Sequence, residues 1–208
     1  MRNEPNERWV PLAPESLPED PLMAFELWYA EAGKVMREPE AICLATADAE
    51  GQPRARMVLL RVRDERGFCF FTNYTSRKGS DLAENPKASI LWYAEPLGRQ
   101  VRIEGVIEQL TETESDEYFA SRPRGHQLGA HVSEQSALIG SRAELEARIG
   151  EIEERFEGVE VTRPPQWGGY RLVPSYFEFW QHRTDRLHDR VIFELTSGGG
   201  WSKVRLQP

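Results

Sequence analysis

Long apolar runs and secretory features are missing from this sequence. The most apolar stretch, residues 88–94, is far too short to span a bilayer as a helix. No basic start with an apolar run and a small-residue cleavage pattern marks a signal peptide. The only two cysteines, Cys43 and Cys69, fall in apolar, strand-like segments, which favours buried thiols over a disulfide or redox pair. We therefore expect a cytoplasmic protein without a membrane segment.

Excess positive charge is also lacking. The 208 residues include 26 Lys and Arg against 34 Asp and Glu, which gives a net charge of −8 at pH 7. A chain with this balance does not attract nucleic acid or an anionic membrane over its whole surface. Any anion site must therefore be a local group of cationic side chains that works against the overall charge.

Several common catalytic motifs are missing as well. The sequence has no P-loop, no Gly-x-Gly-x-x-Gly after an expected strand and no Gly-x-Ser-x-Gly nucleophile turn. His182 and His188 have no cysteine near them, and their spacing does not match that of zinc ligands. A phosphate group, if the protein binds one, must be held by side chains rather than by a glycine-rich loop.

The apolar pattern predicts an antiparallel β protein with separate helices. Residues 1–18 are polar and contain prolines, which indicates a mobile arm, and residues 19–208 have no break in composition, which indicates one domain. Strands are expected at residues 41–47, 55–63, 67–74, 87–94, 99–110, 169–173, 176–180, 190–195 and 201–206. Helices are expected from residue 20 to before residue 39, and at 76–85, 111–119 and 141–156. This order favours the α+β class, as a mainly antiparallel barrel with peripheral helices.

Two segments carry cations suited to a phosphate. In the expected strand at 55–63, alternation places Arg56 and Arg61 on opposite faces, so one of them must face the core side. Arginines that reach solvent from the strand ends are the alternative. At residues 71–78 a strand runs into a helix start that presents backbone N–H groups, hydroxyls, Arg77 and Lys78 together. The alternative is that these cations lie at the start of an ordinary helix and face only solvent.

Tyr118, Arg122 and His126 follow at four-residue steps. They would share one face if the helix continued, but Pro123 and Gly125 predict a loop after Arg122. The alternative is an ordinary helix end at the surface.

Residues 179–190, FWQHRTDRLHDR, concentrate cations behind Trp180. If the segment is a strand, alternation places Arg186, His188 and Arg190 on one face. An exposed strand with salt bridges is the alternative interpretation.

In this order and spacing, the segments resemble the pyridoxine (pyridoxamine) 5′-phosphate oxidase family. The resemblance covers the chain from about Asp20 to Pro208. It rests on Arg56-Met-Val-Leu-Leu-Arg61, Phe71-Thr-Asn73, Ser76-Arg-Lys78, Arg99-Gln-Val101, Ser121-Arg-Pro-Arg124, Gln127-Leu-Gly-Ala130, Val132-Ser-Glu-Gln-Ser136, Trp167-Gly-Gly-Tyr170, Phe177-Glu-Phe-Trp180 and Arg186-Leu-His-Asp-Arg190.

The resemblance implies an FMN-binding split β-barrel that forms a homodimer with FMN at the subunit interface. It implies oxidation of pyridoxine or pyridoxamine 5′-phosphate to pyridoxal 5′-phosphate, with O2 reduced to H2O2. The FMN contacts it implies are Arg56, Met57, Val58, Leu59, Arg61, Phe71, Thr72, Arg77, Lys78, Gln100, Gln135, Ser136, Trp180 and Arg190, partly from the partner chain. The substrate contacts it implies are Arg61, Tyr118, Arg122 and His126 at the phosphate, with Arg186 and His188 as catalytic residues over the pyridine ring.

Three positions depart from the family pattern. Arg61 stands where the family usually has lysine, His126 where it has a small residue, and His182 where it has glycine. Two other functions stay open. One is a related split-barrel flavin oxidase acting on another aromatic metabolite of the phenazine type. The other is a protein that binds FMN or pyridoxal phosphate without turnover.

Overall fold

The computed structural model describes residues 10–208, so residues 1–9 of the expected arm lie outside it. The helices are α1 (Pro21–Ala32), α2 (Arg77–Glu84), α3 (Glu112–Ser121), α4 (Arg124–Val132) and α5 (Arg142–Arg155). The strands are β1 (Ala41–Ala47), β2 (Pro53–Leu59), β3 (Val62–Asp64), β4 (Gly67–Asn73), β5 (Lys87–Ala94), β6 (Arg99–Gln109), β7 (Trp167–Gln181), β8 (Asp189–Leu195) and β9 (Trp201–Leu206). Short 3-10 helices lie at Pro14–Ser16, Glu95–Leu97 and Thr184–Arg186.

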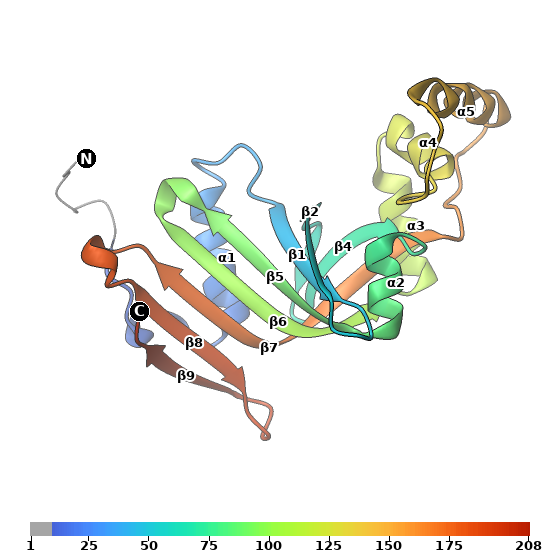
Figure 1. Ribbon diagram of the computed structural model, residues 1–208. Coiled ribbons are helices and arrows are strands. Elements are labelled where there is room, and N and C mark those ends of the chain that lie inside the picture. Colours follow the sequence, from blue (N-terminus) through green and yellow to red (C-terminus); the bar gives the residue numbers. More distant parts are fainter. Residues whose placement is uncertain (1–9) are drawn as a thin grey trace.

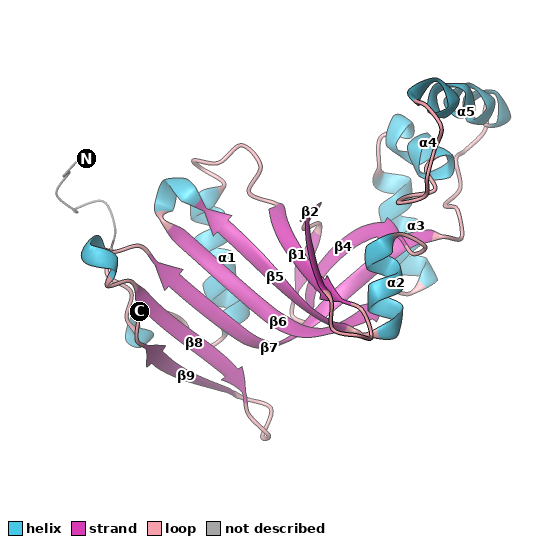
Figure 2. Ribbon diagram, viewed as in Figure 1, coloured by secondary structure: helices cyan, strands magenta, loops and turns pink. Residues whose placement is uncertain are grey.

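These strands form one antiparallel sheet. Its main order is β2-β1-β5-β6-β7-β4-β3, and β8 and β9 extend it beside β7 (Figures 1 and 2). Strands that are neighbours in sequence pair in hairpins, as β1 with β2, β5 with β6 and β8 with β9. The structure therefore confirms the mainly antiparallel fold with peripheral helices.

The sheet curls because its two ends are joined by a very short link. β2 and β3 stand at opposite ends of the strand order, yet only Leu60 and Arg61 separate them in sequence. A link of this length brings the end of β2 to the start of β3, so this part of the sheet curls into a half-barrel. The expected single strand at 55–63 is therefore wrong, because its halves pair with different strands, β1 and β4.

β7 belongs to two parts of the sheet, one with β4 and one with β8. Its residues 167–172 pair with β4 and its residues 176–181 pair with β8, so the sheet divides beside β7. Between these halves, the register with β6 shifts at Glu104/Gly105, opposite Pro174. Proline cannot donate to the ladder and is tolerated at such a bulge. The expected strands at 169–173 and 176–180 are thus one strand with an irregularity.

α1 covers the core of the barrel with aromatic side chains. Phe25 contacts the edges of Phe68 and Trp92 at ring-centroid distances of 5.1 and 5.5 Å, and Trp28 contacts Phe179 at 5.1 Å. All of these rings are buried, and edge-to-face pairs of this kind stabilise a core beyond their buried area.

α3, α4 and α5 gather at one end of the molecule (Figure 1). They pack around a second apolar cluster that contains Phe119, Leu128, Phe156 and Trp167. The loop expected after Arg122 is wrong, because Pro123 stands at the N-cap of α4. Proline fits a helix start, where its missing N–H costs nothing.

Residues 10–18 pack against the sheet instead of leaving it. Leu12 and Leu17 are buried, the Leu12 N–H donates to Asp189 at 3.1 Å, and Arg205 donates to the Leu12 carbonyl at 2.8 Å. The mobile arm expected over residues 1–18 is therefore wrong for this part. A single domain over 19–208 stays a prediction, supported by one sheet that runs from β1 to β9. No helix within residues 10–208 is long and apolar enough to cross a membrane.

Candidate active site

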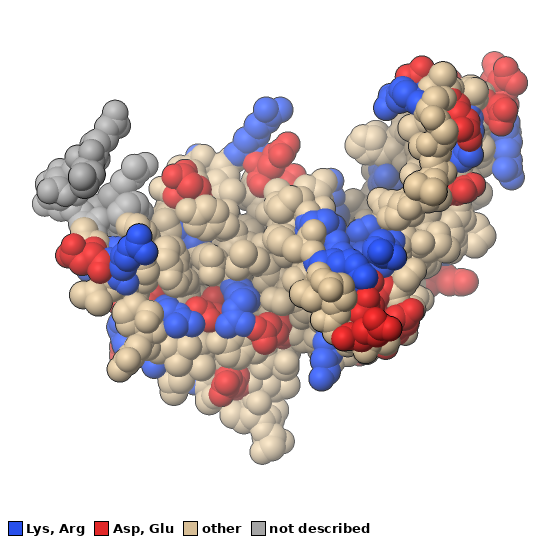
Figure 3. Space-filling model, viewed as in Figure 1, with Lys and Arg blue, Asp and Glu red and all other residues tan. Residues whose placement is uncertain are grey.

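A large open cavity lies where the barrel meets α3 and α4. Its volume is about 1010 Å³. Its lining includes many of the predicted site residues: Met57, Val58, Leu59, Arg61, Phe71, Thr72, Lys78, Tyr118, Arg122, His126 and Gln135. Arg77 and Ser136 line a shallower neighbouring pocket that shares Gln135. Figure 3 shows Lys and Arg side chains gathered near α2 on this face, with acidic side chains directly beneath.

Lys78, on the first turn of α2, is a buried cation among neutral groups. Its Nζ lies 2.8 Å from Thr72 Oγ1, 3.0 Å from Ser76 Oγ and 2.5 Å from Gln135 Oε1. Burial, together with the nearby positive charge of Arg56, lowers the pKa of Lys78 to about 8. No carboxylate within residues 10–208 forms an ion pair with it. A phosphate here would supply the missing negative charge.

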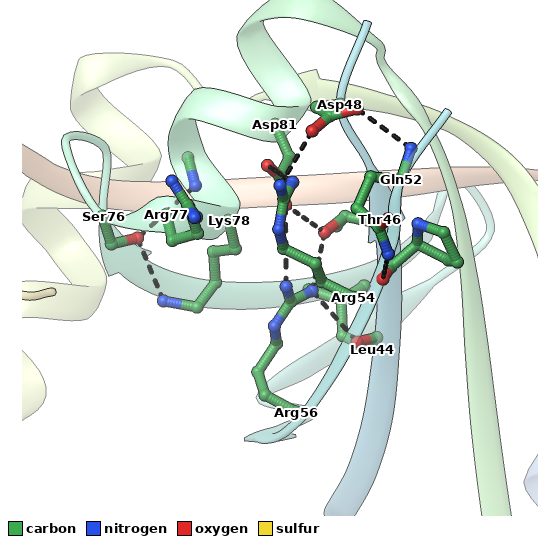
Figure 4. A network of polar contacts seen from close by, with 12 residues as sticks. Leu44, Thr46, Asp48, Gln52, Arg54, Arg56, Ser76, Arg77, Lys78 and Asp81 are labelled. Atoms are coloured by element: carbon green, nitrogen blue, oxygen red, sulfur yellow. Dashed lines mark hydrogen bonds and ion pairs between the residues drawn. The ribbon is translucent and has the colours of Figure 1, made fainter. Parts of the chain in front are cut away.

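Arg56 reaches the same place from β2. Its Nη1 donates to the Leu44 carbonyl at 3.1 Å and to Thr46 Oγ1 at 2.8 Å, and its Nη2 lies 3.6 Å from Asp81 Oδ2. Figure 4 shows Arg56 and Lys78 beside each other at the start of α2. Arg77 is exposed there, and its backbone N–H donates to Ser136 Oγ at 3.3 Å. These groups form a compact cationic corner.

A second cationic group lies on the α3 side of the cavity. The Arg122 guanidinium lies 4.5 Å from the Trp167 ring centroid, and its Nη1 is buried with no hydrogen-bond partner among the described residues. Burial is the main cause that lowers the pKa of Arg122, and the charge of Arg61 adds to it. An unsatisfied buried donor is costly, so this nitrogen fits an anion.

Tyr118 lies next to Arg122 in an aromatic stack. The centroid of its ring lies 3.7 Å from that of Phe71 and 6.2 Å from that of Trp167, and the ring planes are nearly parallel. This stack fixes the phenol at the cavity wall. Arg61 and His126 are exposed at the cavity, and Arg61 lies 3.9 Å from Glu40, too far for a strong hydrogen bond. Trp167 belongs to this wall, although the roles expected from sequence did not include it.

The other predicted residues lie elsewhere. Trp180, His182, Arg186 and His188 line a separate pocket of about 390 Å³ around the short helix before β8. Figure 1 shows the start of β8 at the opposite end of the sheet from α2. Gln100 on β6 pairs with Trp180 on β7, which in turn pairs with Arg190 on β8. One chain therefore carries two partial sites.

His188 has a defined hydrogen-bonding state in this second pocket. Its ring lies 4.5 Å from Trp180 and 5.1 Å from His182, and its Nδ1 accepts the Arg183 N–H at 3.1 Å. Burial lowers the pKa of His188, and His182 and Arg186 lower it further. The neutral ring with Nδ1 as acceptor carries its proton on Nε2.

Arg186 and Arg190 do not share a strand face as alternation predicts. Arg186 lies in the 3-10 helix Thr184–Arg186 with φ of 61°, and β8 begins only at Asp189. That interpretation is wrong because the segment turns before it pairs. Arg190 is held by Glu178, with 2.7 Å between Nε and Oε1.

Several exposed apolar side chains surround these partial sites. Met57 and Leu187 are 64% and 68% exposed, and Leu59 and Val62 are also exposed. Contact with another chain would remove these side chains from water. No group of three or more His, Cys, Asp or Glu side chains in residues 10–208 is placed to hold a metal ion.

Two family models match most of the chain. Pyridoxamine 5′-phosphate oxidase matches residues 30–156, and the pyridoxine 5′-phosphate oxidase C-terminal dimerisation region matches residues 167–208. The pyridoxine/pyridoxamine 5′-phosphate oxidase of Burkholderia thailandensis is 56% identical over 192 residues, 91% of this chain and 89% of the relative. That of Burkholderia mallei is 55% identical over the same shares of both chains.

Solved structures agree with these matches. PhzG from Burkholderia lata 383, in complex with tetrahydrophenazine-1-carboxylic acid, has a TM-score of 0.90 and 35% identity, over 97% of this chain and 100% of that chain. A pyridoxamine 5′-phosphate oxidase-related, FMN binding protein of Nostoc punctiforme shares the fold, with a TM-score of 0.73 and 16% identity. This match covers 91% of this chain and 98% of the Nostoc punctiforme chain.

The fold defines a split-barrel protein, and its cationic side chains gather in two separate pockets. The chain belongs to the pyridoxine/pyridoxamine 5′-phosphate oxidase family, whose cofactor is FMN.

Proposed function

We propose that this chain oxidises pyridoxine 5′-phosphate or pyridoxamine 5′-phosphate to pyridoxal 5′-phosphate with bound FMN, and that O2 is reduced to H2O2. The observation that carries the proposal is the pair of cationic groups in one cavity. Lys78 and the Nη1 of Arg122 are both buried without a carboxylate partner among the described residues. FMN and the substrate each carry one phosphate monoester, so two separate sets of cations are needed.

The corner at α2 fits the FMN phosphate. Lys78, Arg56 and Arg77 supply charge, and Thr72 and Ser136 supply hydroxyl groups. The start of α2 adds backbone N–H groups and the positive end of the helix dipole. We assign Gln135, which accepts from Lys78, to the flavin beside this corner.

The substrate phosphate is assigned to the α3 side. Arg122 offers its unpartnered Nη1, and Tyr118, Arg61 and His126 line the same wall. Arg61 can bind the phosphate with two parallel N–H groups, as arginine does and lysine does not. The phosphate thereby fixes the position of the pyridine ring.

In our proposal, a second copy of the chain supplies Arg186 and His188 over the pyridine ring, and Trp180, Arg190 and Gln100 beside the flavin. Arg186, His188, Trp180, Arg190 and Gln100 are remote from the main cavity, and all but Gln100 lie in the segment matching the dimerisation region. In a two-fold homodimer, the second pocket of one copy covers the main cavity of its partner. Exposed Met57 and Leu187 would be buried in such a contact.

The protein residues orient and desolvate the reactants. FMN, when bound, supplies the hydride acceptor and the route for electrons to O2. His188 holds a proton on Nε2 and can donate it to an oxygen of the substrate ring, and Arg186 adds a positive charge there. The Tyr118–Phe71–Trp167 stack excludes water from one wall. No protein nucleophile is required for this reaction.

The test is anaerobic mixing of the flavin-loaded protein with pyridoxamine 5′-phosphate. We expect the flavin absorbance to bleach, then to recover in air with formation of peroxide and an aldehyde absorbance. A loaded protein that never bleaches would contradict the proposal and would favour an FMN-binding protein without turnover.

A phenazine-type oxidase is the second candidate, because the PhzG structure is so similar to this one. The same assay separates the two functions if pyridoxamine without its phosphate is compared with the phosphate ester. A strong preference for the ester indicates the vitamin B6 reaction, and bleaching only by a reduced phenazine precursor indicates the alternative. The cytoplasmic location expected from the sequence stays a prediction.

A further inference from the structure

A buried carboxylate stands behind the cationic corner, and the proposed reaction gives it no role. Asp81, on α2, is 2% exposed. Its Oδ1 accepts from Arg54 Nη1 at 2.7 Å, and its Oδ2 accepts from Thr46 Oγ1 at 2.7 Å. Figure 4 shows these side chains between α2 and the β1–β2 hairpin.

The hydrogen bonds of this group run in one direction. An ionised carboxylate only accepts, so the single hydroxyl proton of Thr46 points to Asp81. The Thr46 oxygen therefore offers its lone pairs to Arg56, whose Nη1 donates to it at 2.8 Å. The Leu44 carbonyl accepts a second bond from the same nitrogen at 3.1 Å. Two bonds through Nη1 fix the guanidinium plane and leave Nε, together with Nη2 at 3.6 Å from Asp81, able to donate to a ligand.

Arg54 makes the shortest ion pair with Asp81. It donates to Asp81 at 2.7 Å and to Asp48 at 2.8 Å, so its guanidinium is held between two carboxylates. Arg56 lies farther from Asp81, at 3.6 Å. Arg54 is therefore shared by two carboxylates at short distance, whereas Arg56 makes only one longer ion pair and is the arginine better able to turn toward an anion.

We propose that Asp81 is a positioning residue which, through Thr46, holds the Arg56 guanidinium in the orientation that binds the flavin 5′-phosphate. The inference rests on the proposed FMN-binding function. It assigns separate roles to two neighbouring arginines: Arg56 binds the phosphate, and Arg54 neutralises the carboxylate that orients Arg56.

Asp81 could affect FMN affinity through its negative charge or by orienting Arg56, and the two roles predict opposite changes when Asp81 is removed. A negative charge near the phosphate repels it, so its loss would tighten FMN binding if charge dominated. Loss of orientation would weaken FMN binding. Asp81 holds Thr46 by a hydrogen bond of 2.7 Å but lies 3.6 Å from the nearest Arg56 nitrogen, so we expect the loss of orientation to dominate.

The experiment measures the dissociation constants of FMN and riboflavin for the full-length apo-protein by flavin fluorescence. Riboflavin lacks only the phosphate. Asp81→Asn and Thr46→Val should each weaken FMN binding roughly tenfold, as removal of an orienting partner typically does, and leave riboflavin binding unchanged. Asp48→Asn is the matched control, because it removes a carboxylate from Arg54 without touching Arg56. It should leave FMN binding unchanged.

Several outcomes would overturn the inference. These are FMN binding that is unchanged or tighter in both variants, an equal loss of riboflavin binding, or an Asp81→Asn effect that persists in an Arg56→Ala background. If Asp81→Asn does not fold, Thr46→Val decides the question alone. A wild-type protein that does not bind FMN contradicts the proposed function itself. Normal wild-type binding with unaffected variants contradicts only this inference.

Discussion

At the scale of single residues, Lys78 and Arg122 differ from Arg54 and Arg190 in their neighbours. Arg54 and Arg190 are paired with carboxylates at 2.7–2.8 Å. Lys78 contacts only neutral oxygens, and Arg122 keeps one buried nitrogen without a partner. Both are cations that the fold leaves uncompensated, which suits side chains that bind anionic ligands.

If Lys78 binds the FMN phosphate as proposed, FMN binding should depend on pH. Its pKa is lowered to about 8, so the free protein loses this charge as the pH rises through 8. The FMN phosphate is already fully ionised there, since its second pKa is about 6. Affinity for FMN should therefore be highest below pH 8 and fall by up to about tenfold per pH unit above it. Titrations between pH 7 and 9.5 measure this directly.

Two controls make the pH test specific. Riboflavin affinity should stay flat over the same range, and Lys78→Arg should flatten the FMN profile because arginine keeps its proton. A wild-type FMN affinity that does not change with pH would show that Lys78 does not contact the phosphate.

Replacing Arg122 should weaken binding of the substrate and leave binding of the cofactor unchanged. Arg122→Gln removes the charge that faces the substrate phosphate, and a hydrogen bond to a charged group contributes about 1.5–3 kcal/mol. We expect KM for pyridoxamine 5′-phosphate to rise roughly ten- to a hundredfold, with FMN affinity unchanged. Arg124→Gln is the control, because Arg124 binds the carbonyls of Phe156 and Val159 outside the cavity. Equal KM changes in both variants would contradict the assignment of Arg122.

At the scale of elements, the sequence predicted the starts of helices correctly but did not predict which strands pair. Ser76, Thr111 and Ser141, where the sequence predicted helices to begin, each cap a helix, because a cap depends only on residues nearby in sequence. The expected strand at 55–63 failed because its second half crosses to β4. The Asp81–Thr46–Arg56 group was also missed, since it needs α2 to pack on the β1–β2 hairpin.

Gly79 sets how closely α2 approaches the end of β4. A Cβ at this position would overlap the Tyr74 carbonyl oxygen, so the helix start carrying Lys78 would have to shift. Gly79→Ala should reduce stability by about 1–3 kcal/mol, as overpacking typically does, and weaken FMN binding. Thermal unfolding and FMN titration measure the two effects. Ser80→Ala, an exposed neighbour on the same helix, is the control. If the two variants are equally stable, this close approach is unimportant.

At the scale of the whole molecule, the predicted site residues lie in two separate places. The sequence predicted the residues that gather in the main cavity and those around His188, but it could not show that one chain holds them apart. That separation follows from the register of β6, β7 and β8 and from the length of the sheet. The exposed apolar side chains and the match to a dimerisation region support a second copy as the partner.

Mixing two inactive variants tests this account most directly. Lys78→Ala impairs the main cavity and Arg186→Ala impairs the second pocket, so each homodimer should have little activity. Dissociating and reassociating an equal mixture, with FMN present, should restore about a quarter of the wild-type sites, because half of the dimers then contain one intact site. Mixing without subunit exchange is the control. Activity that stays at the level of the separate variants after proven exchange would contradict a site shared between two copies.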